Sequence, residues 1–158
     1  FSQMMNRLLK LDPNKKLIFT VSPVRYLRDG FIQNTRSKAA LLLCCEILEK
    51  KFENVFYFPS YELLMDDLRD YRFTQEDMVL PTSQTIDYIW NYFEQVLFND
   101  RTRLINLKIE RLNKKLNHRP LFSEHPSHTS LKEMARDELA QLKQNYPEVN
   151  FKFNNLEL

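Results

Sequence analysis

The sequence predicts an α/β protein with a parallel sheet, followed by a helical C-terminal region. Two short apolar runs, residues 17–21 and 55–58, are each followed by a segment with the apolar spacing of a helix. Continuous apolar runs of this kind are typical of strands that are covered on both faces of a parallel sheet. The chain also has a single glycine, Gly30, which favours helices over glycine-dependent hairpins. Strand, helix, strand and helix in this order indicate a right-handed crossover unit.

The first predicted strand is framed by two helices. Residues 2–11 have the pattern of a helix that stops before Pro13, because the residue that precedes a proline disfavours helical backbone. Pro23 follows the end of the strand, and a loop over residues 25–33 leads to a helix of about 17 residues. The apolar stripe expected on that helix consists of Ala40, Leu43, Cys44, Ile47 and Leu48.

The second predicted strand leads into two further helices. Ser60 is expected to cap the first of them. That helix carries Leu64, Leu68 and Tyr71. After a loop around Asp77, Thr82 or Ser83 can cap the second helix, whose apolar stripe is the clearest in the sequence. Its members are Ile86, Ile89, Trp90, Phe93 and Leu97. Packing in the core is a simpler expectation for these side chains than a ligand site.

The last third of the chain is predicted to be mainly helical. A helix over about residues 101–116 has Ile105, Ile109, Leu112 and Leu116 on one face. A polar stretch, residues 117–129, reads as a loop or linker. The last helix, about residues 130–146, carries Leu131, Ala135, Leu139 and Leu142. Residues 149–153 are a candidate short edge strand.

Length and composition bound the organisation and exclude several classes of protein. The 158 residues suffice for an α/β part over residues 1–100 with a helical extension, residues 101–158, packed on it. A net charge of +2 is too mild to predict a nucleic-acid partner. No apolar run approaches the roughly 20 residues of a membrane helix, so no membrane association is predicted. With one glycine, neither G-x-G-x-x-G nor the P-loop pattern can be formed.

The two cysteines indicate the cellular compartment, and the first residue indicates whether the sequence is part of a longer protein. Cys44 and Cys45 are adjacent, so on a helix they point in different directions and a disulfide between them is not expected. Two free thiols favour a reducing compartment such as the cytoplasm. No targeting signal is visible, and the chain opens at Phe1 rather than at a methionine. We therefore expect that it is a part of a longer protein.

Polar residues follow both predicted strands, where parallel sheets hold their ligands. Ser22 and Arg25 follow the first strand, and Tyr61 and Glu62 follow the second. Ser22 lacks the flanking glycine of a nucleophile elbow, so a role in the turn after the strand is the simpler alternative. Arg25 is suited to an anionic group, and an ion pair with an acidic neighbour is equally reasonable. These four residues are the predicted substrate-binding set.

Three further groups of charged or histidine residues can each be interpreted as a binding site or as ordinary solvent-exposed surface. The acidic residues around Arg69 and Arg72 could bind Mg²⁺, but ion pairs on a solvated face are expected instead. Their carboxylates belong to Asp66, Asp67, Asp70, Glu76 and Asp77. The three histidines, His118, His125 and His128, are too loosely spaced for zinc and are expected in a surface loop. The basic residues Lys108, Arg111 and Lys115 fit phosphates, but also the solvated face of an amphipathic helix. No metal and no cofactor is predicted.

Several motifs occur in a fixed order in the first half of the chain. They are Phe19-Thr-Val-Ser-Pro-Val-Arg25, Asp29-Gly30, Ser37-Lys-Ala39, Tyr57-Phe-Pro-Ser-Tyr-Glu62, Asp70-Tyr-Arg-Phe73 and Glu76-Asp-Met78. Together they resemble the GSCFA family, which is similar to the SGNH, or GDSL-like, hydrolases. The resemblance implies a three-layer α/β/α fold around a parallel sheet. It also implies hydrolysis of a small-molecule or glycan ester by a serine nucleophile, a histidine base and an orienting aspartate.

The chain departs from that family pattern at the residues that carry the chemistry. No residue matches the Gly-Ser-Cys-Phe-Ala segment that would supply the nucleophile. In Asp77-Met-Val-Leu-Pro81 the place of the histidine base is taken by Leu80, and Tyr26 stands where a histidine is expected after Arg25. Asp77 is the only triad residue that can be carried over. The sequence therefore predicts the C-terminal part of an SGNH-like domain with impaired ester hydrolysis, or a non-enzymatic ligand-binding module on the same scaffold.

Overall fold

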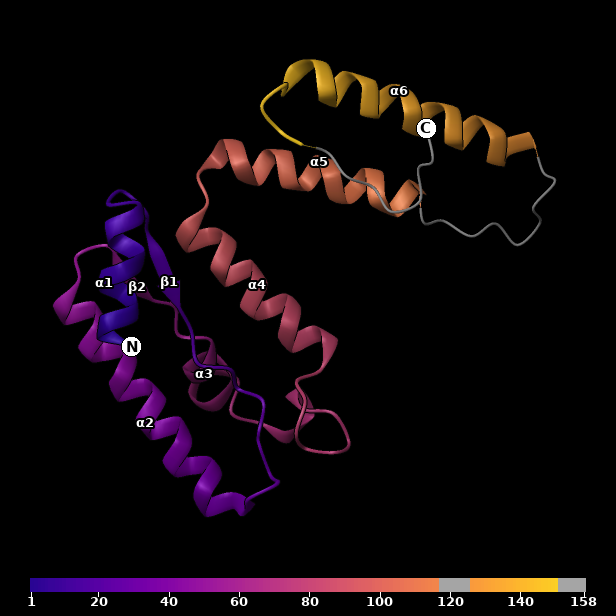
Figure 1. Cartoon of the computed structure of the whole chain (residues 1–158). Helices are drawn as coiled ribbons and strands as arrows, with labels where there is room; N and C mark the ends of the chain where they lie inside the picture. Colours follow the sequence, from indigo (N-terminus) through magenta and orange to yellow (C-terminus); the bar gives the residue numbers. More distant parts are fainter. Residues whose placement is uncertain (117–125, 151–158) are drawn as a thin grey trace. The chain divides into compact units, whose positions relative to one another are not determined.

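The chain folds as two compact units, Phe1–Leu97 and Phe98–Leu158, in a computed structural model that describes residues 1–116 and 126–150 (Figure 1). The first unit is mixed α/β and contains two strands, β1 (Leu17–Phe19) and β2 (Val55–Tyr57). The second contains the helices α5 (Asp100–Leu116) and α6 (Pro126–Asn145). Packing of the helical extension on the α/β part stays a prediction.

The two strands pair in parallel, as the sequence predicts. Ile18 stands opposite Phe56 in the ladder, and the bond from the Phe58 amide to the Phe19 carbonyl, 2.8 Å, continues the pairing beyond β2. Each strand is shorter than its apolar run, and the remaining residues form the chain segments that leave the sheet. These segments bring the carboxyl ends of both strands to the same edge.

Only one face of this small sheet is well covered. Met5 of α1 (Ser2–Leu11) and Leu48 of α2 (Gly30–Lys51) pack against Val55, and all three side chains are buried. Ile18 and Phe56, which alternate to the opposite face, remain 45% and 43% exposed. The prediction that both faces are buried is therefore wrong for these central residues. A two-stranded parallel sheet is confirmed, and the three-layer arrangement is not.

The helix α2 is longer than predicted and is turned differently against the sheet. It begins at Gly30, whose φ of 84° is in the left-handed region that glycine tolerates, so the preceding loop ends before residue 33. Its buried residues are Lys38, Cys45 and Leu48. Leu43 and Ile47, predicted in the buried stripe, are each 59% exposed. Apolar residues occur nearly all round this helix, so their periodicity does not select one face.

After β2 the chain makes a short, irregular helical segment. It consists of α3 (Ser60–Glu62), the π-helix η1 (Leu63–Leu68) and, after a break, the 3₁₀-helix η2 (Tyr71–Phe73). Tyr71 therefore does not share a helix with Leu64, as was predicted. The prediction of Ser60 as a helix cap is wrong too, because Pro59 takes the N-cap position and the Ser60 hydroxyl donates to the Val21 carbonyl at 2.9 Å.

The helix α4 (Ser83–Leu97) completes the first unit. Thr82 is its cap, because its Oγ1 accepts from the Thr85 amide at 3.3 Å. Ile86 and Trp90, expected in the core, are 54% and 47% exposed. The prediction of complete core packing is therefore wrong for both, since they line an open cavity.

The second unit is a pair of helices with its own apolar core. Leu112 of α5 packs with Ala135, Leu139 and Leu142 of α6, in agreement with the predicted stripes. The helix α6 begins at Pro126 rather than near residue 130. His118, His125, the His128 and Leu131 side chains, and residues 151–153 of the predicted edge strand lie outside the described residues. No helix in the described ranges is long and apolar enough to cross a membrane.

Candidate functional site

An open cavity of about 320 Å³ lies at the carboxyl ends of β1 and β2. The segment that leaves β1 contributes Ser22, Pro23 and Val24, and the segment that leaves β2 contributes Phe58 and Ser60. This is the edge where parallel α/β sheets hold their ligands. We call this space the strand-end cavity.

The far wall of the strand-end cavity is the apolar side of α4. It consists of Ile86, Ile89, Trp90 and Phe93, and Pro81 lies just before the helix. The Phe93 ring contacts Phe58 edge-on at 5.0 Å and stacks on Trp90 at 5.4 Å between centroids. These ring contacts attach α4 to the end of β2 and leave the apolar face of Trp90 beside the cavity.

The polar side chains of this cavity are hydroxyls at the strand ends. Ser60 Oγ forms a short hydrogen bond with Thr20 Oγ1 while it donates to the Val21 carbonyl, so both hydroxyls serve to join the two strand ends. Ser22 is exposed, and its Oγ accepts from the Val24 amide at 3.2 Å. This contact supports the predicted role of Ser22 in the turn after the strand. No charged side chain of the described residues lines the cavity.

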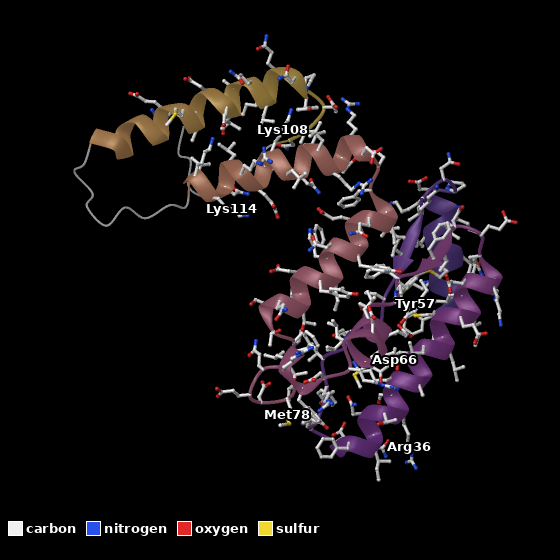
Figure 2. All side chains as sticks on the ribbon, turned by 180° about the vertical axis from the view of Figure 1, so that it is seen from behind. Arg36, Tyr57, Asp66, Met78, Lys108 and Lys114 are labelled. Carbon is white, nitrogen blue, oxygen red and sulfur yellow. The ribbon has the colours of Figure 1, made fainter. Side chains whose placement is uncertain are left out.

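Asp77 shapes the loop that delivers Pro81 to the cavity. Its Oδ1 accepts from the Val79 amide at 2.8 Å and from the Leu80 amide at 3.2 Å. Met78, which lies on this loop in Figure 2, has a φ of 55°, an uncommon value for a residue with a side chain. Leu80 is exposed and is not part of the cavity wall. The Asp77 carboxylate thus holds a turn beside the position where a histidine was expected.

Removal of the Asp77 carboxylate should loosen this turn. We expect Asp77→Ala to lower the free energy of unfolding by about 1 kcal/mol, as for the loss of a capping side chain. Asp77→Asn should cost less, because the amide oxygen can still accept both backbone bonds. Urea denaturation of the two variants beside Glu76→Ala, an exposed neighbour, measures the difference. Equal effects of all three substitutions would contradict the capping role.

Lys38 supports the strand-end loop from the side opposite the α4 wall. Its side chain is almost buried, and Nζ donates to the Ser22 carbonyl at 2.5 Å. Burial lowers the pKa of Lys38 below its usual value, because a charged ammonium is poorly solvated there. A smaller cavity of about 160 Å³ on this side is lined by Lys38, Cys44 and Cys45. Burial also raises the pKa of the Cys45 thiol, and both thiols are free.

The lowered pKa of Lys38 should appear in the pH dependence of stability. The folded chain binds fewer protons than the unfolded chain between the folded pKa of Lys38 and its unfolded value of 10.5. The free energy of unfolding contributed by Lys38 should therefore rise with pH in that window. Urea denaturation of the wild type and Lys38→Met at pH 8, 9 and 10 should show the free energy of unfolding of the wild type rising relative to that of the variant as the pH approaches 10.5. Lys10→Met, which removes an exposed lysine of α1, is the control, and an equal pH dependence of the two variants would contradict the effect of burial.

The predicted substrate-binding residues do not all meet at one place. Ser22 lines the strand-end cavity, whereas Arg25 lines a second hollow, and the wall of neither includes Tyr61 or Glu62. Glu62 accepts a hydrogen bond from the Tyr57 hydroxyl at 2.8 Å. Burial and this bond raise the pKa of Tyr57. Glu62 therefore has a structural partner, and nothing in the described contacts gives Tyr61 one.

The other predicted clusters have structural partners in the described part of the chain. Asp66 lies 4.0 Å from Arg69, and Asp70 lies 3.9 Å from Arg72, as expected of a solvated acidic face. On α5, Lys115 pairs with Glu138 of α6. Among the described residues, no three His, Cys, Asp or Glu side chains are grouped closely enough to hold a metal ion.

The sequence analysis missed two features of the site. Lys38 was noted only as part of the Ser37-Lys-Ala39 motif and was given no role, although a lysine amid an apolar helix is a signal of a buried polar contact. The α4 stripe was assigned to the core, because periodicity identifies an apolar face but not what covers it.

Comparison with known proteins gives one match. A model of the GSCFA family matches residues 1–93, more than half of the chain. No curated protein and no solved structure gives a significant match. The matched region includes every residue that lines the strand-end cavity, and also Lys38 and the Asp77 loop.

Proposed function

The chain belongs to the GSCFA family, and from that premise we propose that it binds the acyl part of an ester in the strand-end cavity without hydrolysing the ester efficiently. The observation that supports this proposal most is the lining of the cavity. Aliphatic and aromatic side chains form its walls, and its polar side chains are mainly the hydroxyls at the strand ends. The same proposal places β1 and β2 in a three-layer SGNH-like sheet.

The size and chemistry of the cavity favour an acyl group over a bare sugar. A volume of about 320 Å³ is at the lower end of the range for small-molecule sites, roughly 300–1,000 Å³. A saccharide would need many polar partners, and its hydroxyls would lose hydrogen bonds against α4. An alkyl chain loses none and gains from leaving water. A glycan or other alcohol portion of the ester would then remain outside the apolar walls.

Weak hydrolysis follows from the residues around Asp77. A serine hydrolase needs a base to take the proton of the nucleophile, and the resemblance places that base at position 80. Leu80 can neither accept nor donate a proton, and the Asp77 oxygen that would orient a histidine bonds to backbone amides. Loss of a triad base typically costs roughly 10⁴-fold or more in rate.

Ester hydrolysis by the wild type and Leu80→His tests this part of the proposal. With p-nitrophenyl acetate as substrate, we expect the wild type to turn over no faster than Ser22→Ala. Equal rates would show that Ser22 has no catalytic role and serves only in the turn. We expect Leu80→His alone to leave the rate of hydrolysis unchanged, because the segment that would supply the nucleophile has no match in this sequence. Fast wild-type turnover that follows Michaelis–Menten kinetics would show that another residue serves as the base, and the chain would then be an ester hydrolase.

A further inference from the structure

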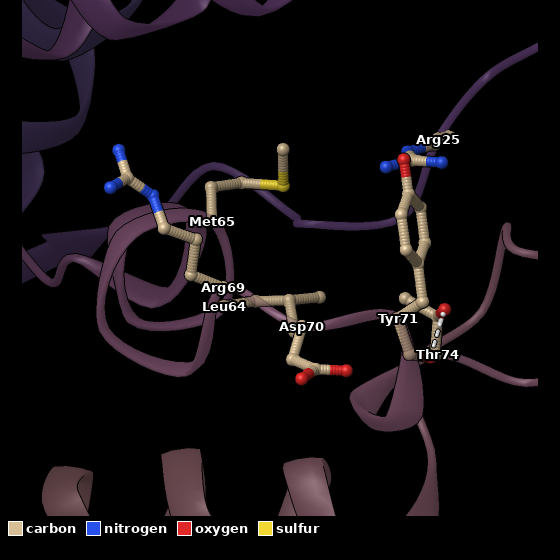
Figure 3. Close-up of a pocket in the computed structure, with 7 residues that line it drawn as sticks. All are labelled: Arg25, Leu64, Met65, Arg69, Asp70, Tyr71 and Thr74. Atoms are coloured by element: carbon tan, nitrogen blue, oxygen red, sulfur yellow. Dashed lines mark hydrogen bonds between the residues drawn. The ribbon is translucent and has the colours of Figure 1, made fainter.

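A second hollow, of about 210 Å³, lies between the segment that follows β1 and the segment that contains η1 and η2 (Figure 3). Its charged and polar lining residues come from separate elements: Arg25 from the segment after β1, Arg69 from the end of η1, and Asp70, Tyr71 and Thr74 from around η2. Leu64 and Met65 supply an apolar floor. This hollow therefore has two arginines beside apolar side chains, whereas no arginine among the described residues lines the strand-end cavity.

Arg25 is held in place by the backbone of the Asp77 loop. Its amide donates to the Val79 carbonyl and its Nη1 donates to the Met78 carbonyl, both at 3.2 Å. A guanidinium has five N–H donors, so most of them are left for other acceptors. Among the described residues, no carboxylate lies within 4.0 Å of Arg25. The half-buried Arg25 is therefore a positioned cation without a counter-ion.

Arg69 occupies a backbone position that is unusual for its residue type. It ends η1 in the left-handed region, with a φ of 43°, and its amide donates to the Leu64 carbonyl at 3.1 Å. Such a conformation costs about 1 kcal/mol or more for a residue with a side chain. In Figure 3, Arg69 and Arg25 stand at the two sides of the hollow, with Met65 between them in this view.

The acidic residues near this hollow already have cationic or amide partners. Asp70, which also lines it, accepts from the Arg72 amide at 2.9 Å and lies 3.9 Å from the Arg72 Nε. Asp66 lies 4.0 Å from Arg69, at the limit of an ion pair between two well-exposed side chains, and so neutralises it weakly. The positive charge of Arg25 is left in excess.

We infer that this hollow binds a small organic oxyanion, with the anionic group on Arg25 and an apolar body against Met65 and Tyr71, while Arg69 on the other side of the hollow adds positive charge. Arginine forks suit the paired oxygens of carboxylates and phosphates. The Tyr71 ring is largely exposed and offers a flat apolar surface. This site is separate from the proposed ester site, because its lining residues are different.

Titration of the 158-residue protein with benzoate and with phenyl phosphate tests this inference. The arginine Nε–Hε signals in ¹⁵N NMR spectra report binding, and phenol, which has the ring without the charge, is the control ligand. We expect saturable shifts of the Arg25 signal with at least one of the two anions, smaller shifts of the Arg69 signal, and no shifts with phenol. A preference for one anion identifies the headgroup as carboxylate or phosphate.

Substitutions separate this site from general electrostatic attraction. Arg25→Gln should weaken anion binding about tenfold or more, and Arg25→Lys should weaken it less. Arg69→Gln removes the more distant charge of the hollow and should have a smaller effect than Arg25→Gln. Arg36→Gln, on the exposed surface of α2, removes the same charge elsewhere and should leave binding unchanged. Equal losses in Arg25→Gln and Arg36→Gln, or equal binding of phenol, would overturn the inference. Ester binding at Trp90 should be unchanged in Arg69→Gln, so the two proposals can fail separately.

Discussion

Replacement of Leu48 by alanine should lower the free energy of unfolding by about 3 kcal/mol. Leu48 is 2% exposed and packs against Met5 and Val55, where α1, α2 and β2 meet. Shortening it removes apolar contacts and leaves a cavity that the two-stranded sheet cannot close without shifting a helix. Urea denaturation followed by circular dichroism measures this loss.

Ile47→Ala is the matched control for this prediction. Ile47 precedes Leu48 on the same helix, and the sequence pattern placed both in one buried stripe, yet Ile47 is 59% exposed. We expect a change within about 0.5 kcal/mol for Ile47→Ala. Similar losses for the two variants would mean that α2 is turned differently against the sheet than described.

Replacement of Ile86 by glutamate should weaken ester binding about tenfold or more. Ile86 lies on the α4 wall of the strand-end cavity and is 54% exposed, so a charged side chain there can stay hydrated while the site is empty. An alkyl chain in the cavity would displace that water and leave the carboxylate poorly solvated. Affinity for ethyl 6-bromohexanoate, a neutral ester, is the quantity to measure.

Val96→Glu introduces the same charge on the same helix outside the cavity. Val96 is 60% exposed and does not line the strand-end cavity. Affinity for the ester should therefore match that of the wild type. If both glutamate variants lost affinity equally, the effect would come from the charge of the protein or from the stability of α4, and the ester would not occupy this cavity.

The elements that local sequence determines were predicted well. The parallel pairing of β1 with β2 follows from two apolar runs separated by a helix, and α1 ends before Pro13 because proline disfavours helical backbone in its predecessor. The Thr82 cap was one of two candidates at a helix start. The helix end and the cap depend on residues that are close in the sequence, and the pairing of the two distant strands follows from the general rule for strand–helix–strand connections.

The features that tertiary packing determines were predicted less well. Ser60 has the sequence context of a cap, but its hydroxyl is drawn to the Val21 carbonyl, a partner 39 residues away. The stripe with Trp90 reads as core, but whether an apolar face is covered depends on what lies opposite. Arg25 lines a different hollow from Ser22, although the two residues are only three positions apart. Their spacing could not predict this, because Arg25 contacts the Asp77 loop, which is distant in the sequence.

Quenching of Trp90 fluorescence by ethyl 6-bromohexanoate tests the strand-end cavity most directly. Trp90 is the only tryptophan of the chain and lines this cavity, so all tryptophan emission of the protein comes from a side chain in the cavity wall. Bromine quenches tryptophan emission on contact. We predict saturable quenching that unbrominated ethyl hexanoate reverses by competition. Quenching that rises linearly with concentration, as for free N-acetyltryptophanamide, and that ethyl hexanoate does not reverse would contradict the account.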